Sequence, residues 1–315
     1  MTSLGQPKGL ALGGTGIGDH PDGQANADAV VAAAWDDGVR CFDTAPMYGG
    51  GTAERWMGRA LAAYPRDAFV LSSKVGRLVR GADEVVPPGE HPQWRFDFSA
   101  DGIRRSVEES LERLGVDRLD VAFVHDPDDH LDVVTRKSYP ALARLRSEGL
   151  VGRIGAGLCQ VPTLLHLLRT IELQVALLAG RLSLVDGEAV GEVLPLVAEQ
   201  GVDLVVASAL QAGLVDGRDS GLFHYAPTPP DVVARVAALH AVCERHRTPL
   251  AAVALQAVLA LPEVAMVLTG AADVGQWRQN LAWSRWSVPT ELWHELSSSR
   301  LLSLDLPPAL LRSRP

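Results

Sequence analysis

VRCFDTAPMYGGGTAERWMGRALAA, residues 39 to 63, contains a short apolar run followed by an amphipathic segment. The run at 39–44 predicts a buried strand, and the pattern at 52–63 predicts a helix. Seven further apolar runs occur along the chain, at 9–14, 68–74, 119–125, 151–157, 173–179, 202–208 and 264–270. Helical patterns lie near 25–37, 99–114, 137–149, 161–171, 188–200, 231–261 and 273–283.

This alternation predicts the class of fold. Continuous apolar strands that alternate with helices are typical of a parallel sheet covered on both faces. Eight strand-then-helix units favour an α/β fold of the (β/α)8 TIM barrel type. The alternative is an open doubly wound sheet, for which GGTGIG at 13–18 resembles a dinucleotide-binding turn, a weak signal because glycine clusters are common in such loops. Without a linker, repeat or low-complexity tract, we expect one domain over residues 1–315.

The composition argues against several classes of partner. The chain carries 29 Lys and Arg against 38 Asp and Glu, a formal net charge of −9, and has no basic run. We therefore expect neither nucleic acid nor an anionic membrane as a partner. Three cysteines lie far apart without a CxxC pair, which predicts neither a disulfide framework nor a zinc site. The N-terminus shows no secretory signal, so we expect a cytoplasmic protein, and the sequence leaves its oligomeric state open.

Polar side chains end three consecutive predicted strands. Asp43 ends the second, Lys74 the third and His125 the fourth, and Tyr48 lies in the loop just after Asp43. In a barrel the carboxyl ends of the strands meet at one rim, so we expect these four side chains to converge and Asp43 to pair with Lys74. A single polar strand end is about as often merely solvated. Three on adjacent strands, with a tyrosine, favour a site.

A tyrosine beside a lysine suits proton transfer. A phenol's ordinary pKa of about 10 falls when an ammonium group lies close, because the phenolate is favoured. Asp43 would keep Lys74 charged, and His125 would orient a substrate oxygen. The chemistry indicated is proton movement at a carbonyl or alcohol, for which a cofactor must supply the hydride, because no side chain does so.

Two long loops, at 76–98 and 212–230, follow predicted strands and are the candidate substrate walls. Each of their larger side chains could equally line a substrate pocket or lie on the ordinary surface of the loop. These are His91, Trp94, Arg95, Phe96, His224 and Tyr225.

Three segments together resemble the aldo-keto reductases. They are FDTAPMYGGGTAERWMGRAL at 42–61, LSSKVGR at 71–77 and VAFVHDPDDH at 121–130, which look like the aspartate, tyrosine, lysine and histidine segments of that family. Stretches at 177–184, 226–246 and 249–271 resemble the branch that contains L-fucose, L-galactose and D-threo-aldose 1-dehydrogenases. The resemblance implies a barrel that binds a nicotinamide cofactor in an extended pose, without a Rossmann domain. It also implies a catalytic tetrad of Asp43, Tyr48, Lys74 and His125.

The resemblance further implies a cofactor site, and two of its segments depart from the family pattern. Cys159 stands where the branch usually has Asn, with Gln160 as a substitute, although Cys159 is equally suited to packing. After the last strand, Ala272 replaces the usual Arg, Asp273 is the expected N-cap of the next helix, and Arg278 is the basic residue of TGAADVGQWRQN at 269–280. We therefore expect NAD(H) rather than NADP(H). The implied cofactor residues are Cys159, Gln160, Leu210, Gln211, Gly213, Thr269, Gly270, Ala271, Gln276 and Asn280.

The main hypothesis is an oxidoreductase that exchanges hydride between a nicotinamide cofactor and a carbonyl/alcohol pair, at C1 of an aldose or a similar hemiacetal. One alternative is a reductase of aldehydes or ketones in a specialised metabolic pathway. Another, of a different class, is a redox-inactive nucleotide-sensing or assembly subunit. The altered cofactor segments are compatible with a redox-inactive subunit, whereas the intact tetrad argues for an enzyme.

Overall fold

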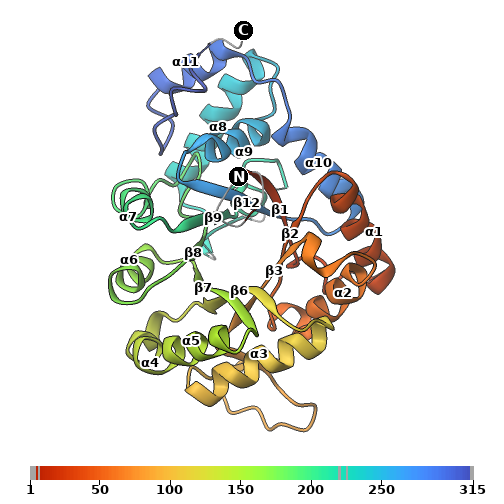
Figure 1. Cartoon of the computed structure of the whole chain (residues 1–315). Helices are drawn as coiled ribbons and strands as arrows, with labels where there is room; N and C mark the ends of the chain where they lie inside the picture. Colours follow the sequence, from red (N-terminus) through yellow and green to blue (C-terminus); the bar gives the residue numbers. More distant parts are fainter. Residues whose placement is uncertain (1–4, 6–7, 219–220, 225, 313–315) are drawn as a thin grey trace.

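The eight apolar runs form a closed barrel of parallel strands in the computed structural model (Figure 1), which describes residues 5, 8–218, 221–224 and 226–312. Around the barrel the strands follow the order β1–β12–β9–β8–β7–β6–β3–β2. This closure confirms the predicted (β/α)8 barrel, and the alternative of an open sheet is wrong. The barrel strands are β1 (Gly9–Gly13), β2 (Cys41–Asp43), β3 (Val70–Val75), β6 (Leu119–His125), β7 (Val151–Leu158), β8 (Val175–Ala179), β9 (Asp203–Ala207) and β12 (Val264–Gly270).

Helices surround the barrel (Figure 1). In α3 the ends are fixed by capping: Ser99 Oγ accepts a hydrogen bond from the Gly102 N–H at 3.0 Å, and Gly115 closes the helix with φ 66°. The longer helices that cover the barrel are α1 (Gly23–Asp36), α2 (Thr52–Leu61), α3 (Ala100–Leu114), α5 (Tyr139–Ser147), α6 (Val161–Thr170), α7 (Val193–Gln200), α9 (Leu250–Ala260) and α10 (Val274–Ser284). A single turn, α4 (Leu131–Val133), precedes α5.

The predicted helix at 231–261 is wrong, because the structure has two helices there. α8 (Pro230–Arg245) ends before a short turn, and α9 begins directly after Pro249. Proline has no N–H to donate and disfavours a helical conformation in the residue before it, so the chain cannot continue as one helix. A further helix, α11 (Thr290–Ser298), follows α10 and was not predicted from the sequence.

The interior of the barrel is filled by apolar side chains that point inward from several strands. Phe123 on β6 packs beside Gly155 on β7. A Cβ atom at Gly155 would lie 2.5 Å from the Phe123 ring, so a glycine at this position leaves room for the aromatic side chain. This inner cluster comprises Ala11, Cys41, Val121, Phe123, Val175, Leu177, Val205 and Met266.

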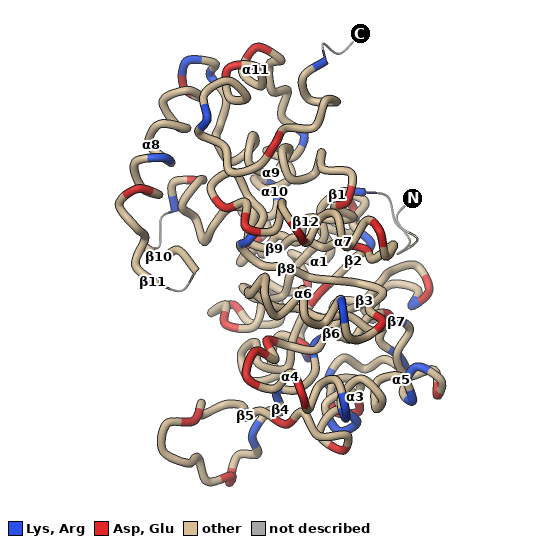
Figure 2. The backbone as a smooth tube through the Cα atoms, turned by 90° about the vertical axis from the view of Figure 1, so that its left-hand side faces the viewer, with Lys and Arg blue, Asp and Glu red and all other residues tan. Residues whose placement is uncertain are grey.

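Both long loops after strands contain a short hairpin. The first pairs β4 (Arg77–Val79) with β5 (Trp94–Phe96), and the second pairs β10 (Leu222–Phe223) with β11 (Ala226–Pro227). Figure 2 shows the two hairpins projecting from the same side of the barrel, with acidic and basic residues interspersed along the tube. Within the described ranges, no helix combines the length and the apolar character needed to cross a membrane.

Candidate active site

The four polar residues predicted to converge do so at the carboxyl rim of the barrel. Asp43 and Lys74 lie on the neighbouring strands β2 and β3, and His125 ends β6, which pairs with β3. Lys74 Nζ donates to Asp43 Oδ2 at 2.6 Å and to the Thr44 carbonyl at 2.9 Å. The pairing of Asp43 with Lys74 is therefore confirmed.

Three consecutive glycines shape the turn that carries Tyr48. Gly49, Gly50 and Gly51 have φ of 57°, 59° and 86°, a region that residues with a Cβ adopt only at a cost. This turn lets the chain reverse between β2 and α2 while Tyr48 faces the cavity. The Tyr48 ring centroid lies 4.9 Å from Lys74 Nζ and 6.4 Å from the His125 ring, which meets it edge-on.

Burial and neighbouring charges set the protonation of this cluster. The Lys74 side chain is 3% exposed, and burial opposes its charge, but Asp43 and Tyr48 outweigh burial and raise the pKa of Lys74 above its ordinary value. Burial first, and then the positive charges of Lys74 and Arg77, hold the pKa of His125 well below its ordinary value of 6.5. The site therefore combines an ammonium group with a neutral imidazole, which has one N–H to donate.

A cavity of about 710 Å³ lies over these residues. His91 and Trp94 from the first hairpin loop line it, so for these two side chains the structure favours pocket wall over ordinary loop surface, which the sequence left open. His224 instead lines an adjoining cavity of about 260 Å³ and pairs with Asp186 at 2.6 Å, and Phe96 is 44% exposed. Tyr225 falls outside the described residues.

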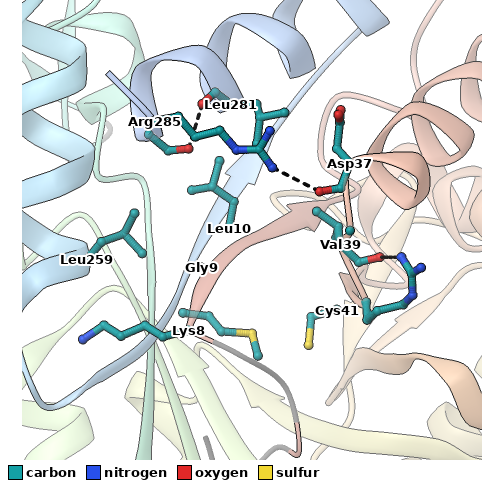
Figure 3. Close-up of a pocket in the computed structure, with 13 residues that line it drawn as sticks. Lys8, Gly9, Leu10, Asp37, Val39, Cys41, Leu259, Leu281 and Arg285 are labelled. Carbon is teal, nitrogen blue, oxygen red and sulfur yellow. Dashed lines mark hydrogen bonds between the residues drawn. The ribbon is translucent and has the colours of Figure 1, made fainter. Parts of the chain in front are cut away.

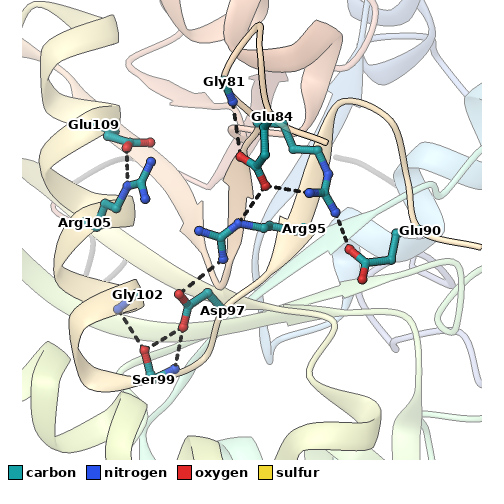
Figure 4. A network of polar contacts seen from close by, with 10 residues as sticks. Gly81, Glu84, Glu90, Arg95, Asp97, Ser99, Gly102, Arg105 and Glu109 are labelled. Atoms are coloured by element: carbon teal, nitrogen blue, oxygen red, sulfur yellow. Dashed lines mark hydrogen bonds and ion pairs between the residues drawn. The ribbon is translucent and has the colours of Figure 1, made fainter. Parts of the chain in front are cut away.

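Ion pairs hold the first hairpin loop in place (Figure 4). Arg80 bonds both Glu84, at 2.5 Å, and Glu90, and Arg95 joins Glu84 to Asp97 at 3.2 and 3.4 Å. Asp97 in turn accepts a hydrogen bond from Ser99 Oγ at 2.6 Å, at the start of α3. Although burial opposes it, these hydrogen bonds lower the pKa of Asp97, so the carboxylate that connects the loop to the helix stays charged.

A second cavity, of about 360 Å³, continues from the first along the rim, and Ser208 and Gly270 line both. Five residues assigned to the cofactor line this second cavity: Leu210, Gly213, Thr269, Gly270 and Asn280. Cys159 and Gln160 line the first cavity, beside the four convergent residues. The rim therefore carries one elongated groove.

Three residues assigned to the cofactor have other surroundings. Ala271 is buried, and Gln276 is engaged in the start of α10, where its N–H donates to the N-cap Asp273 and its Oε1 accepts from the Ala272 N–H. Gln211 lines the 260 Å³ cavity. Its Nε2 donates hydrogen bonds to two groups of the protein itself, Gly180 O and Ser183 Oγ, at 2.7 Å each. The expected N-cap role of Asp273 is confirmed.

The groove fits an elongated dinucleotide. Asn280 is 1% exposed and donates from Nδ2 to Gly270 O at 3.0 Å, which leaves its buried Oδ1 without a partner among the described residues. A buried acceptor of this kind accepts a hydrogen bond from water or from a bound group, and its place in the groove suits a ligand donor. Arg218, in the loop after β9, also lines this cavity and was not predicted from the sequence, because that loop was assigned to the substrate. Asp216 bonds its guanidinium at 2.8 Å.

A cavity of about 500 Å³ also opens at the amino end of the strands (Figure 3). Its basic side chains bond backbone carbonyls: Arg285 bonds Asp37 O at 3.2 Å, and Arg40 bonds Trp35 O at 2.8 Å. Lys8 bonds Leu261 O, and its burial lowers the pKa of its ammonium group. In the part of the chain that the structure describes, no group of three or more His, Cys, Asp or Glu residues is placed to hold a metal ion.

Comparisons with known proteins point to one family. The family model described as the aldo/keto reductase family matches residues 9–300. A D-threo-aldose 1-dehydrogenase from a Pseudomonas species is 38% identical over 288 residues, covering 87% of this chain and 88% of that protein. A pyridoxal 4-dehydrogenase from Microbacterium luteolum is 36% identical over 329 residues, covering 94% and 96%. The first of these relatives lies in the branch that the sequence segments resemble, which confirms that resemblance.

Solved structures agree with this result. The structure of a glycerol dehydrogenase from Gluconobacter oxydans matches with a TM-score of 0.74 and 25% identity, covering 95% of this chain and 94% of that one. The match therefore covers nearly the whole of both chains.

Proposed function

Since this chain belongs to the aldo/keto reductase family, we propose that it is a dehydrogenase that oxidises C1 of an aldose, or of a similar cyclic hemiacetal, with NAD(H) as its preferred cofactor. The chain is an oxidoreductase, and reactions of its family use a nicotinamide cofactor. One observation carries the proposal. Lys74 Nζ lies 2.6 Å from Asp43 and 4.9 Å from the Tyr48 ring, in a cavity that His125 also lines.

Each of the four residues has a task in this oxidation. Tyr48 accepts the proton of the C1 hydroxyl, and the Lys74 ammonium stabilises the negative charge of the phenolate that does so. Asp43 favours the charged form of Lys74, which burial opposes. Neutral His125 donates a hydrogen bond to the reacting oxygen and orients it. A nicotinamide cofactor held by the residues that line the groove, among them Gln160, Gly270 and Asn280, would supply the acceptor for the C1 hydride.

The groove supports a cofactor without a 2′-phosphate. A phosphate dianion requires basic partners, and the segment after β12 offers uncharged Gly270 and Ala271 followed by the carboxylate of Asp273. Arg278 is exposed on α10 and lines none of the rim cavities, and Asp216 already bonds Arg218. Fluorescence titration with NADH and NADPH at one ionic strength tests this preference. Binding of NADPH about ten-fold tighter, a difference of about 1.4 kcal/mol, would overturn it.

The polar lining of the rim cavity supports a polyhydroxylated substrate, because carboxylate and amide side chains such as Asp19, Gln93 and Asp126 match hydroxyl groups. A relative named for an aldose supports the same class. The test is a screen of aldoses, aromatic aldehydes and ketones in both reaction directions. Oxidation of an aldose with the highest kcat/KM is expected, and a screen in which no aldose reacts would refute the substrate class.

The second candidate is an aldehyde or ketone reductase, because the same four residues serve either direction. A relative named for pyridoxal and a structure named for glycerol favour substrates beyond the aldoses. Steady-state rates in both directions separate the candidates. A redox-inactive role predicts no turnover with any substrate in the screen, whichever cofactor is bound.

A further inference from the structure

Asp126 follows His125 directly and lines the same cavity, and its side chain is 24% exposed. Its backbone has φ 40°, in the left-handed region that residues other than glycine seldom adopt. The conformation is held by the Asp126 N–H, which donates to Gly157 O at 3.1 Å. Backbone strain of this kind persists where the surrounding structure fixes it, and it clusters at functional sites.

Arg77 holds this carboxylate in one position. Arg77 Nη2 bonds Asp126 Oδ2 at 2.6 Å, and its guanidinium lies 4.6 Å from the Trp94 ring and 5.2 Å from the Phe96 ring. Burial raises the pKa of Asp126, while Arg77 and the backbone N–H of Cys159, which donates to the carboxyl group, favour the charged form. The carboxylate is therefore preorganised before any substrate binds, and Arg77 comes from the base of the hairpin loop that lines the same cavity.

The position of Asp126 next to the reacting centre defines what it can recognise. Asp126 Oδ2 lies 3.6 Å from His125 Nε2, beyond hydrogen-bond range, so the imidazole and the carboxylate border the same space without bonding each other. Because the two side chains are this close, we expect a substrate oxygen bound by His125 to have its neighbouring carbon and hydroxyl group near Asp126. An ionised carboxylate only accepts hydrogen bonds, and a hydroxyl group is the donor that matches it.

We infer that Asp126, fixed by Arg77, is a specificity-determining residue that accepts a hydrogen bond from the substrate hydroxyl next to the reacting carbon. The inference rests on the proposed function, and it identifies the hydroxyl group next to the reacting carbon as the feature of the substrate that the site recognises. Trp94 provides an apolar wall beside this contact, against which a carbon skeleton can pack. The substrate class is thus a 2-hydroxy aldehyde or its cyclic hemiacetal.

Pairs of substrates that differ in this hydroxyl group test the inference. Lactaldehyde and propionaldehyde form such a pair for reduction with NADH, and the best aldose and its 2-deoxy analogue form one for oxidation. For the wild-type protein we expect kcat/KM to favour the hydroxylated member by about ten-fold or more, because a site built to bond a hydroxyl group rejects an analogue that lacks it. A wild-type ratio near one would overturn the inference.

Two variants assign the selectivity to Asp126. In Asp126→Ala the ratio is expected to fall to about one, and in the isosteric Asp126→Asn to an intermediate value, because the amide is a weaker acceptor. The control is Asp129→Asn, which removes the same charge from an exposed residue three positions away that does not line the cavity, and it should keep the wild-type ratio. Melting temperature and the Kd for NADH show that each variant is folded.

The outcomes separate a specificity role from a structural one. If Asp126 only neutralised Arg77, its variants would lower kcat/KM for both members of each pair equally, and the unchanged ratio would refute the inference. If no aldose reacted but the lactaldehyde ratio still collapsed in Asp126→Ala, hydroxyl recognition would stand while the proposed aldose oxidation would fail. If Asp126→Ala does not fold, the kcat/KM ratio of Asp126→Asn is compared with that of the wild-type protein instead.

Discussion

The two ends of the barrel both contain a large cavity, of about 710 Å³ at the carboxyl rim and about 500 Å³ at the amino rim, but their chemistry differs. At the carboxyl rim a buried ammonium group is paired with a carboxylate beside a phenol and a neutral imidazole. At the amino rim the basic side chains bond backbone carbonyls (Figure 3). Cavity volume alone therefore does not locate the active site.

The direction of the strands explains the difference. All eight strands are parallel, so the residues that end them are gathered at one rim, with the long loops that follow β3 and β9. At the opposite rim, Arg40 bonds the Trp35 carbonyl in the last turn of α1, and Arg285 bonds the Asp37 carbonyl just after this helix. Such bonds satisfy backbone groups of the fold, whereas the carboxyl rim carries side chains that can exchange protons, such as Tyr48 and His125.

The largest effect is expected for Tyr48→Phe. Removal of the phenol hydroxyl deletes the proposed base and should lower kcat by about 10²–10⁴-fold, while the Kd for NADH changes little. Stopped-flow or steady-state oxidation of the best substrate, with fluorescence titration of NADH, measures both quantities. Full turnover in a variant that binds NADH normally would remove Tyr48 from the mechanism and weaken the contrast between the two rims.

Asp43→Asn tests the buried ion pair. The Asp43 and Lys74 side chains are 7% and 3% exposed, and removing one partner of such a pair costs about 3–5 kcal/mol, because the remaining charge is left buried. Urea denaturation should show this loss in the free energy of unfolding. The control is Arg104→Gln, which breaks an exposed pair with Glu148 and should cost less than about 1 kcal/mol. Equal losses in both variants would contradict the role of burial.

His125→Gln tests the neutral imidazole through pH. Because the folded-state pKa of His125 is lowered, the unfolded chain binds a proton below about pH 6.5 while the folded protein does not. His125 therefore makes the wild-type protein lose stability as the pH falls below 6.5, by up to about 1.4 kcal/mol per pH unit. Denaturation of both proteins between pH 7 and pH 5 should show a shallower dependence in the variant. Parallel curves would mean that His125 is protonated in the folded state.

The smallest effect is expected at the amino rim. Arg285→Gln removes a charge that bonds Asp37 O at 3.2 Å, and it should leave kcat/KM within about two-fold and change stability by less than about 0.5 kcal/mol. The assays used for Tyr48→Phe serve here unchanged. A large loss of activity would show that the cavity in Figure 3 is coupled to the reaction at the other rim.

Local features of the sequence were sufficient to predict the barrel strands and several of the residues at the carboxyl rim. The apolar runs placed all eight barrel strands, and the polar residues that end three of them identified Asp43, Lys74 and His125 as neighbours. The reason is physical: a buried parallel strand requires a continuous apolar run, and a charge at its end requires a partner. The failure at 231–261 has an equally local cause, since Pro249 breaks a pattern whose apolar periodicity continues through it.

Other features were decided by tertiary structure alone. Arg218 joins Thr269 and Asn280 in one cavity although the loop of Arg218 lies some fifty residues earlier in the chain, and no periodicity in the sequence encodes that distance. The clamp of Arg77 on Asp126 likewise depends on the hairpin that folds back over the rim and on the positive φ of Asp126. The sequence by itself determined the barrel and the residues that end its strands, because burial and period are local properties. Tertiary structure decided which loop side chains meet above them, because those contacts depend on the paths of segments far apart in the chain.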